Sequence, residues 1–579
     1  MLSSAFAYSA GDSTFKQLTP EELVAAVRKM TWRTHSTAAK ERHNFIKCGV
    51  PVLKQLAESA PSLDAETREQ LNELGIDTER PMAGFGRPEG LEWHYDTGIF
   101  RIHYTLKGNH AVDSTDSDSD GIPDMVELMA ATAEETYAVE IGEHGYTRPP
   151  SDRWYSDNGG SDAYDIYILD LGDLLYGFTQ FEHLANLSGN NEFSEAKEEY
   201  AATSYIVMNS NYSSFLCEEA ACVQVTFAHE FFHAIQFGYD AWDRIWFLES
   251  TAVWMEDEVY NDINDNYYFL ELWMKQPHVA LDYSRAPHWY GSWIFFRYLS
   301  EHLGGPATIR KMFEQSVENV TKDESDNTIY NIDQVLRRRG SSFREALNQM
   351  AVANHLLTSD SDAGDYRYEE GADYREYGIE PRLDRTVTLN GSGAIVEYTG
   401  NELMHNATHY IGFTLPEGAI EMNFESFSDS LRYNINGIPE SGISFSVYRA
   451  RGRTIIPIPT GTDMFTVAVV TDTVKNVKYH YRLTVNTDVI IPTAITLSPN
   501  FPNPFNVTTT IRFFLPTWEE VALSVVDLKG REVKSVKLGE VQAGYNEVTL
   551  ETRDLPSGPY IIKLDGETEI VARKVMLIK

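Results

Sequence analysis

The segment from Ala220 to Phe237 places two histidines and a glutamate inside an otherwise apolar stretch. Its sequence, AACVQVTFAHEFFHAIQF, is long enough for a buried helix and contains His229, Glu230 and His233 in the pattern H-E-x-x-H. Residues four apart share one helix face, so both imidazoles can reach one metal ion while Glu230 projects toward a bound water. Ionisable groups in so apolar a helix are costly without a metal or a partner. The segment therefore predicts a zinc site rather than two histidines bonded to core carbonyls.

A third zinc ligand is expected downstream, because catalytic zinc takes three protein ligands and leaves one position for water. Glu249 and Glu256 lie seven residues apart, two helical turns, in the stretch 246–258. Glu249 is the favoured ligand because three small residues follow it, and these would let its helix approach the first one closely. Glu256 lies in an acidic cluster and stays the alternative.

This pattern resembles that of the gluzincin metallopeptidases, the thermolysin-like superfamily. The resemblance consists of H-E-x-x-H followed, after fifteen intervening residues, by Glu-x-x-Ala in a tryptophan-bearing helix, and residues 93–357 look similar to a bacterial branch of the superfamily. It implies zinc ligation by His229, His233 and Glu249, with Glu230 as the general base. The spacing to the third ligand departs from that of the best-known members, which keeps Glu256 open.

The same resemblance implies a residue that stabilises the oxyanion. The segment 286–298, APHWYGSWIFFRY, is similar to the corresponding family segment, and Tyr290, just before Gly291, is the first candidate. His288 is the second. The alternative for both residues is an aromatic core helix.

Residues 116–127, DSDSDGIPDMVE, predict a calcium site. Acids occupy positions 1, 3, 5, 9 and 12 of a twelve-residue loop, with glycine at position 6, which is the ligand spacing of an EF-hand. The expected ligands are Asp116, Asp118, Asp120, the Ile122 carbonyl, Asp124 and Glu127. Because a strand-like run precedes the loop, we expect a structural clamp rather than a sensor.

The predicted fold class is α+β. Helical spacing indicates a helical N-terminal region, 1–92, and leaves open whether it is a signal remnant or a propeptide. A zincin-like catalytic domain is expected at 93–385, where strand-like and helical stretches mix, followed by an alternating β-sandwich domain at 386–490.

The last module, 491–579, is also expected to be a small β-sandwich. From Leu497 to Lys579 it resembles the C-terminal sorting domains of the bacterial type IX secretion pathway. That resemblance implies contact with the secretion machinery and export across the outer membrane, so the protein is expected to be secreted or held at the cell surface.

Charge and hydropathy exclude two classes of partner. Acidic residues outnumber basic ones by 86 to 48, giving a net charge of -38 that repels phosphate backbones, so nucleic acid is not expected. No apolar run is long enough to span a bilayer. Among the three cysteines, Cys217 and Cys222 can pair only if Cys217 lies in a turn before the helix.

These patterns together predict a secreted zinc metalloendopeptidase acting on a protein or peptide substrate. Two alternatives stay open: a non-catalytic surface or adhesion protein with a vestigial zinc site, and a metal hydrolase of non-peptide substrates. The intact Glu230 argues against the first, since a structural zinc site needs no general base.

Overall fold

The computed structural model describes residues 18–579 apart from short stretches at 31–45, 80–81, 83, 186–190, 216, 319–326, 390–392, 400–401, 415–418, 428–433, 442–443, 446–447, 451–452, 458–461, 463, 472–478, 488–492, 518, 542–543 and 568. The chain divides into two compact units. One comprises Met1–Gln276 and Ala280–Pro381, and the other comprises Pro277–Val279 and Arg382–Lys579. The fold is mixed α+β, with helices and strands in the first unit and a β-rich second unit.

Six strands of the first unit form one mixed sheet in the order β1-β7-β8-β6-β5-β4. Parallel pairs join β1 to β7, β5 to β6 and β6 to β8, whereas β7 is antiparallel to β8 and β4 to β5. Nearly continuous burial of β6 and β8 places them at the centre of the core. The bounds are β1 (Ile46–Cys48), β4 (Trp93–Asp96), β5 (Phe100–Tyr104), β6 (Tyr164–Leu169), β7 (Leu175–Leu184) and β8 (Ala202–Asn209).

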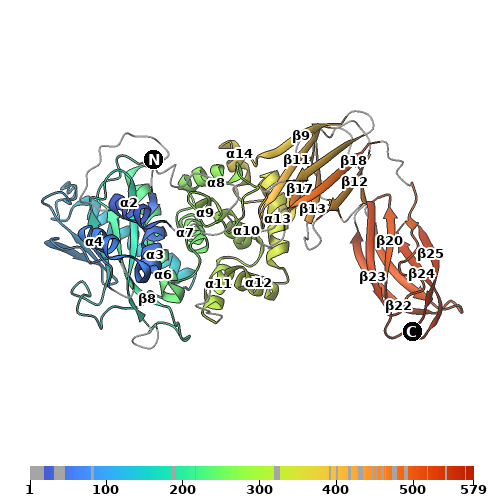
Figure 1. The fold of residues 1–579 in the computed structure, drawn as a ribbon, viewed down its shortest axis with the longest axis horizontal. Helices are drawn as coiled ribbons and strands as arrows, with labels where there is room; N and C mark the ends of the chain where they lie inside the picture. Colours follow the sequence, from blue (N-terminus) through green and yellow to red (C-terminus); the bar gives the residue numbers. More distant parts are fainter. Residues whose placement is uncertain are drawn as a thin grey trace. The chain divides into compact units, whose positions relative to one another are not determined.

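The long helix α6 (Glu219–Asp240) packs along β7 and β8, with α5 (Asp124–Tyr137) and α7 (Ile245–Val259) against it (Figure 1). Phe227 and Phe231 of α6 meet Phe100 of β5 edge to face, with ring centroids 5.8 and 5.4 Å apart. Such aromatic contacts bury large apolar areas and fix how the helix lies on the sheet. The H-E-x-x-H segment is therefore held by the core itself.

Small polar residues line the packed face of α7. The hydroxyl of Thr251 donates to the Phe247 carbonyl at 2.6 Å, and the hydroxyl of Ser250 donates to the Trp246 carbonyl. Because these hydroxyls are satisfied within their own helix, they can be buried at little cost. Further along the chain, this unit contains α8 (Tyr267–Met274), α9 (His288–Gly291), α10 (Trp293–His302), α11 (Pro306–Glu318), α12 (Thr328–Arg338), α13 (Phe343–Leu356) and α14 (Gly371–Glu376).

The N-terminal region is helical where helical spacing predicts it, but it also enters the central sheet. The helices are α2 (Pro20–Met30), α3 (Val50–Ser59) and α4 (Ala65–Glu73), and β2 (Ile76–Asp77) pairs with β3 (Gly84–Phe85). Thr19 and Glu22 cap α2 by exchanging side-chain and backbone hydrogen bonds of 2.8 and 3.2 Å. Strand β1 lies beside β7, so this region belongs to the same compact unit as α6.

The first part of the second unit is a β-sandwich. One sheet has the order β10-β18-β12-β16, the other β14-β13-β17-β11-β9, with β15 paired to β13. Both sheets contribute to one core, in which Val396 and Leu483 of the first meet Phe413 and Val467 of the second. The bounds are β9 (Leu383–Thr388), β10 (Ala394–Thr399), β11 (Thr408–Thr414), β12 (Ala419–Ser426), β13 (Asn434–Ser441), β14 (Ser444–Phe445), β15 (Tyr448–Ala450), β16 (Arg453–Pro457), β17 (Met464–Val470) and β18 (His480–Asn486).

The C-terminal module has its own core between two further sheets, with orders β19-β20-β23 and β22-β21-β24-β25. Ile511 and Phe513 of one sheet pack with Leu523 and Ile562 of the other. The bounds are β19 (Thr496–Leu497), β20 (Thr508–Leu515), β21 (Glu519–Val526), β22 (Glu532–Val541), β23 (Gly544–Glu551), β24 (Gly558–Gly566) and β25 (Ile570–Leu577). The period-two alternation of its sequence therefore corresponds to strands with one buried face.

Candidate metal centre

Three elements bring four possible metal ligands together in the first unit. Helix α6 carries His229 and His233, α7 carries Glu249, and the end of β1 carries Cys48. One ligand atom of each side chain lies within 4.8 Å of the others, and all four residues are buried. The structure thus unites the two predicted histidines with Glu249, and it adds a cysteine that sequence reasoning missed.

The ligand atoms of the three predicted residues nearly touch. His229 Nε2 and His233 Nε2 are 3.0 Å apart, while Glu249 Oε2 lies 3.4 Å from His229 Nε2 and Glu249 Oε1 lies 3.3 Å from His233 Nε2. Zinc bonds of about 2.0–2.1 Å in tetrahedral geometry would separate ligand atoms by about 3.3 Å. The spacing of these side chains fits a zinc ion.

Hydrogen bonds on the far side of each ring aim the imidazoles at this point. Gln236 Nε2 donates to the Leu248 carbonyl at 2.9 Å, which leaves Gln236 Oε1 to accept from His233 Nδ1 at 2.7 Å. His229 Nδ1 donates to Glu256 Oε1 at 2.6 Å. With both Nδ1 atoms donating, each ring turns its Nε2 toward the other ring and toward Glu249, and Nε2 is free to bind a cation when the ring is neutral.

Glu249 adds negative charge to this cluster of acceptors. Its two buried carboxylate oxygens lie 3.4 and 3.3 Å from the imidazole Nε2 atoms, and no group of the described residues donates a hydrogen bond to either oxygen. Burial opposes ionisation of Glu249, but the imidazoles of His233 and His229 outweigh it and lower its pKa to about 2. Burial likewise opposes charge on His229, but the carboxylates of Glu249 and Glu256 raise its pKa to about 10. The centre favours positive charge, which a divalent cation would supply.

Glu230 lies beside the cluster on the same helix and is held by the sheet. Thr179 of β7 donates its hydroxyl to Glu230 Oε2 at 2.8 Å, whereas Oε1 is buried without a hydrogen-bond partner. Burial raises the pKa of Glu230. Thr179 therefore fixes one oxygen, and the Cys48 thiol interacts with the same carboxylate.

The two oxyanion candidates point to different places. The Tyr290 ring centroid lies 6.4 Å from that of His229, and burial, followed by the charge on Glu249, raises the pKa of its phenol. His288 Nε2 instead donates to the Ala280 carbonyl at 3.0 Å, as a core histidine does. Positions two apart on a helix face nearly opposite ways, so α9 can direct only one of them at the metal cluster.

The predicted calcium loop folds as a tight acidic turn before α5. Carboxylate oxygens of Asp116, Asp118 and Asp120 lie within 4.8 Å of one another. Gly121 has a φ of 95°, which permits the turn, and its N–H donates to Asp116 Oδ2 at 2.9 Å.

The other predicted calcium ligands lie around this turn. Ile122 donates its N–H to Asp120 Oδ1 at 2.8 Å. Asp124 accepts from the Ser117 N–H at 2.7 Å, and Glu127 follows in the first turn of α5. Burial and the charges of the loop, Asp118 first, raise the pKa of Glu127.

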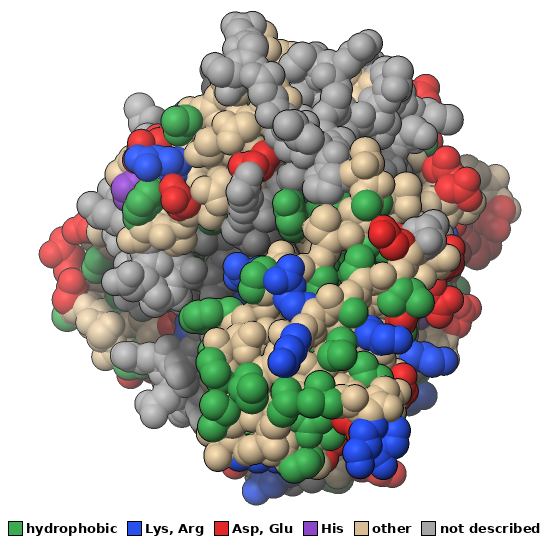
Figure 2. Space-filling view, turned by 90° about the vertical axis from the view of Figure 1, so that its right-hand side faces the viewer, with side chains coloured by type: hydrophobic (Ala, Val, Ile, Leu, Met, Phe, Trp, Pro, Cys, Tyr) green, Lys and Arg blue, Asp and Glu red, His purple; other side chains and the backbone are tan. Residues whose placement is uncertain are grey.

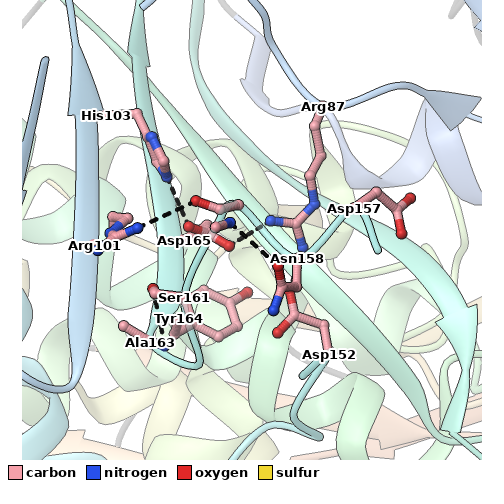
Figure 3. A network of polar contacts seen from close by, with 12 residues as sticks. Arg87, Arg101, His103, Asp152, Asp157, Asn158, Ser161, Ala163, Tyr164 and Asp165 are labelled. Atoms are coloured by element: carbon pink, nitrogen blue, oxygen red, sulfur yellow. Dashed lines mark hydrogen bonds and ion pairs between the residues drawn. The ribbon is translucent and has the colours of Figure 1, made fainter. Parts of the chain in front are cut away.

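A second buried polar cluster surrounds Arg87, and its partners come from strands and loops of the first unit (Figure 3). The guanidinium holds Glu182 through two hydrogen bonds of 2.9 and 2.6 Å and also contacts Asp152 and Asp165. His103 Nε2 lies 2.7 Å from Asp165 Oδ1. These residues are scattered along the sequence, so no local pattern marks them.

Cys217 and Cys222 form a disulfide, with Cα atoms 5.4 Å apart. Cys217 lies in a bend before α6, which begins at Glu219, so the condition that the sequence set for pairing is met. Cys48 is the free cysteine.

Comparison with known proteins matches two parts of the chain. The model of a secretion system C-terminal sorting domain matches residues 500–579. The model of a family of unknown function (DUF6055) matches residues 199–413, which include α6 and α7, and its name assigns no activity. No curated protein matches the chain.

Solved structures give only distant likenesses. Two structures of a Parabacteroides merdae β-glucuronidase, one with glycerol in its active site, share 10% identity, cover 28% and 29% of this chain and 28% of that enzyme, and have TM-scores of 0.11. A calcium-binding mutant of Bacteroides uniformis β-glucuronidase 2 shares 12% identity, covers 29% of this chain and 26% of that one, and has a TM-score of 0.10. The chain thus spans little more than a quarter of the length of these enzymes.

The sorting domain assigns the protein to export through type IX secretion, either into the medium or to the cell surface. Its module exposes large hydrophobic side chains, among them Phe501, Leu528 and Ile570. Figure 2 shows the side of the molecule that lies at the right of Figure 1, where hydrophobic side chains lie among Lys and Arg side chains. Within the described chain, no helix has both the length and the hydropathy to span a bilayer.

Proposed function

We propose that this exported protein is a zinc metallopeptidase whose metal is held by His229, His233 and Glu249. The observation that carries the proposal is the approach of two imidazole Nε2 atoms to 3.0 Å of each other, beside a carboxylate with no hydrogen-bond donor. Buried acceptors cannot face one another at this distance without a cation or added protons between them. The gluzincin-like H-E-x-x-H and Glu-x-x-Ala segments support the same ligands and a zincin-like fold for the first unit.

The surrounding residues suit hydrolysis. Zinc bound here would polarise a scissile carbonyl and acidify a water molecule. Glu230 Oε1 is placed to take the proton of that water and later return it to the leaving amine, while Thr179 holds Oε2. Tyr290, whose ring centroid lies 6.4 Å from that of His229, would donate a hydrogen bond to the oxyanion. Glu256 and Gln236 keep the two imidazoles oriented.

We also propose that calcium binds the loop of residues 116–127. The support is the gathering of three aspartates and the EF-hand spacing of the remaining ligands. Binding would join the loop to the start of α5 and so stabilise the first unit.

One observation favours the non-catalytic alternative. Cys48 Sγ shares the cluster with the three proposed ligands, and closed sets of four protein ligands are typical of structural zinc sites. Glu230 argues for catalysis, because a structural site has no use for a base with an unbonded buried oxygen.

The test combines metal content with hydrolysis of casein and a peptide library, on the full chain and on a Cys48→Ala variant. We expect one zinc per chain in the catalytic cluster and hydrolysis that a chelator abolishes. Glu230→Gln should keep its zinc and lose hydrolysis, whereas Glu271→Gln, on the surface of α8, should keep both. Stoichiometric zinc without hydrolysis of any peptide, in either form, would refute the peptidase and leave the non-catalytic protein and the hydrolase of non-peptide substrates.

A further inference from the structure

The strand that carries Cys48 lies on the edge of the central sheet. β1 pairs in parallel with β7, placing Ile46 opposite Leu175 and Cys48 opposite Gly177. The Gly49 N–H continues the ladder to the Gly177 carbonyl at 3.2 Å. β7 is also the strand whose Thr179 holds Glu230. Main-chain pairing therefore brings an N-terminal segment to the strand next to the proposed base.

Lys47, in the same strand, forms an ion pair with Glu256, which also contacts the proposed ligand His229. Its Nζ lies 2.8 Å from Glu256 Oε2 and 2.7 Å from Asp265 Oδ2, and its side chain is 5% exposed. Glu256 Oε1 in turn accepts from His229 Nδ1. Separating the partners of such a buried ion pair would leave a desolvated charge without its counter-charge. The pair therefore holds β1 against Glu256 of α7.

The chain after Cys48 has little freedom to move. A Cβ at Gly49 would come within 2.5 Å of Met30 Cε and 2.8 Å of Phe178 Cβ, so only glycine fits between α2 and β7. The Val50 N–H at the start of α3 lies 3.3 Å from Cys48 Sγ, where it can donate to the sulfur. The position of the Cys48 thiol is thus set by the pairing of β1 with β7 and by the Val50 N–H.

We propose that Cys48 is a fourth ligand of the metal and keeps the centre latent, so that the N-terminal segment acts as an internal inhibitor. Two observations carry this: the Cys48 sulfur lies within 4.8 Å of the His229, His233 and Glu249 ligand atoms, and both Glu249 oxygens lack donors. Thiolate is a preferred zinc ligand, and four protein ligands leave no position for water. The proposal rests on the proposed function.

Activation then requires only an exchange of ligands. The Cys48 thiolate would leave, take a proton from solvent water and become a thiol, and a second water molecule would take its place. No electrons are transferred, so no oxidant or reductant is involved. Withdrawal of β1 from β7 would release Cys48 and Lys47 together, since the two residues are adjacent in the strand.

Cobalt substitution tests the sulfur ligand without relying on catalysis. Full-length protein reconstituted with Co²⁺ should show an intense thiolate-to-cobalt charge-transfer absorption, and Cys48→Ser should lose this band while still binding one cobalt ion in the cluster. The matched control, Cys217→Ser with Cys222→Ser, should keep the band. X-ray absorption of the zinc-loaded native chain should show one sulfur neighbour at about 2.3 Å, and this measurement needs no variant.

Latency is measured by peptide hydrolysis. Cys48→Ser and Cys48→Ala should hydrolyse peptides about tenfold or more faster than the native chain, as expected if the open state is a tenth or less of the population. Metal bound in the cluster without a sulfur neighbour would overturn the proposal and leave the proposed function standing. A sulfur neighbour with no hydrolysis in the Cys48 variants would overturn the latency and, with it, the proposed function, leaving a structural four-ligand site. Failure to bind metal at all would overturn both.

Discussion

Glu256 Oε1 lies 2.6 Å from His229 Nδ1, on the side of the ring away from the other ligands. Sequence spacing left Glu256 as an alternative to Glu249 for the third ligand. The geometry favours Glu249, because a carboxylate bonded to Nδ1 supports the imidazole and does not share the ion with Nε2. The other oxygen of Glu256 pairs with Lys47, so one carboxylate links β1 to the metal cluster.

We expect Glu256→Gln to weaken zinc binding by about 10- to 100-fold without abolishing it. The amide keeps the shape of the side chain, but it loses the charge that holds His229 and Lys47. Competition with a chromophoric chelator measures the change, and Glu271→Gln provides the surface control. An affinity equal to that of the native chain would show that Glu256 does not support the ligand.

Local patterns predicted the parts of the site that lie on one helix. His229, Glu230 and His233 follow from helical periodicity, and Glu249 follows because small residues let α7 pack on α6. Cys48 could not be found in this way, because it reaches the centre through the pairing of a three-residue strand with a distant β7. So short a strand carries no period, and its partner is chosen by the tertiary fold.

Elsewhere in the fold, elements with a clear sequence period were also predicted, whereas those that depend on distant contacts were missed. Alternation in runs such as residues 479–485 predicted the first part of the β-rich second unit, since a strand with one buried face leaves a period of two, as β18 does. Helical spacing predicted α2, α3 and α4 but gave no sign that β1 joins the sheet between them. The ion cluster of Arg87 was missed because its partners come from separate strands and loops.

The acidic loop should make stability depend on calcium. We expect chelation by EGTA to lower the melting temperature, because a ligand at a hundred times its Kd contributes about 2.7 kcal/mol to the folded state. Asp120→Ala should melt at a lower temperature than the native protein with calcium present and should no longer respond to EGTA. Glu134→Gln, on the exposed side of α5, should respond as the native protein does. Equal melting of the native protein with and without EGTA would contradict a bound calcium ion.

Arg87 should be a major contributor to the stability of the first unit. Arg87→Met would leave Asp152, Asp165 and Glu182 buried without their counter-charge, and we expect a loss of about 3–5 kcal/mol in the free energy of unfolding. Arg101→Met removes a pair with the half-exposed Asp96 and should cost about 0–1 kcal/mol. Urea unfolding compares the two variants, and equal losses would mean that the cluster is not desolvated.

The disulfide at the start of α6 should survive export and stabilise the helix that carries the metal ligands. Export through type IX secretion takes the chain out of the reducing cytoplasm. In the oxidising environment outside the cell a disulfide persists. Closing so short a loop limits the unfolded chain, and we expect Cys217→Ser with Cys222→Ser to lower the free energy of unfolding by about 2 kcal/mol. Metal affinity should change little, because Cys222 lies two turns before His229.

Thiol titration of the unfolded, metal-free native protein provides the check: Cys48 alone should react before reduction and all three cysteines after it. Three reactive thiols before reduction would show that the pair is open, and the predicted loss of stability would then have no cause.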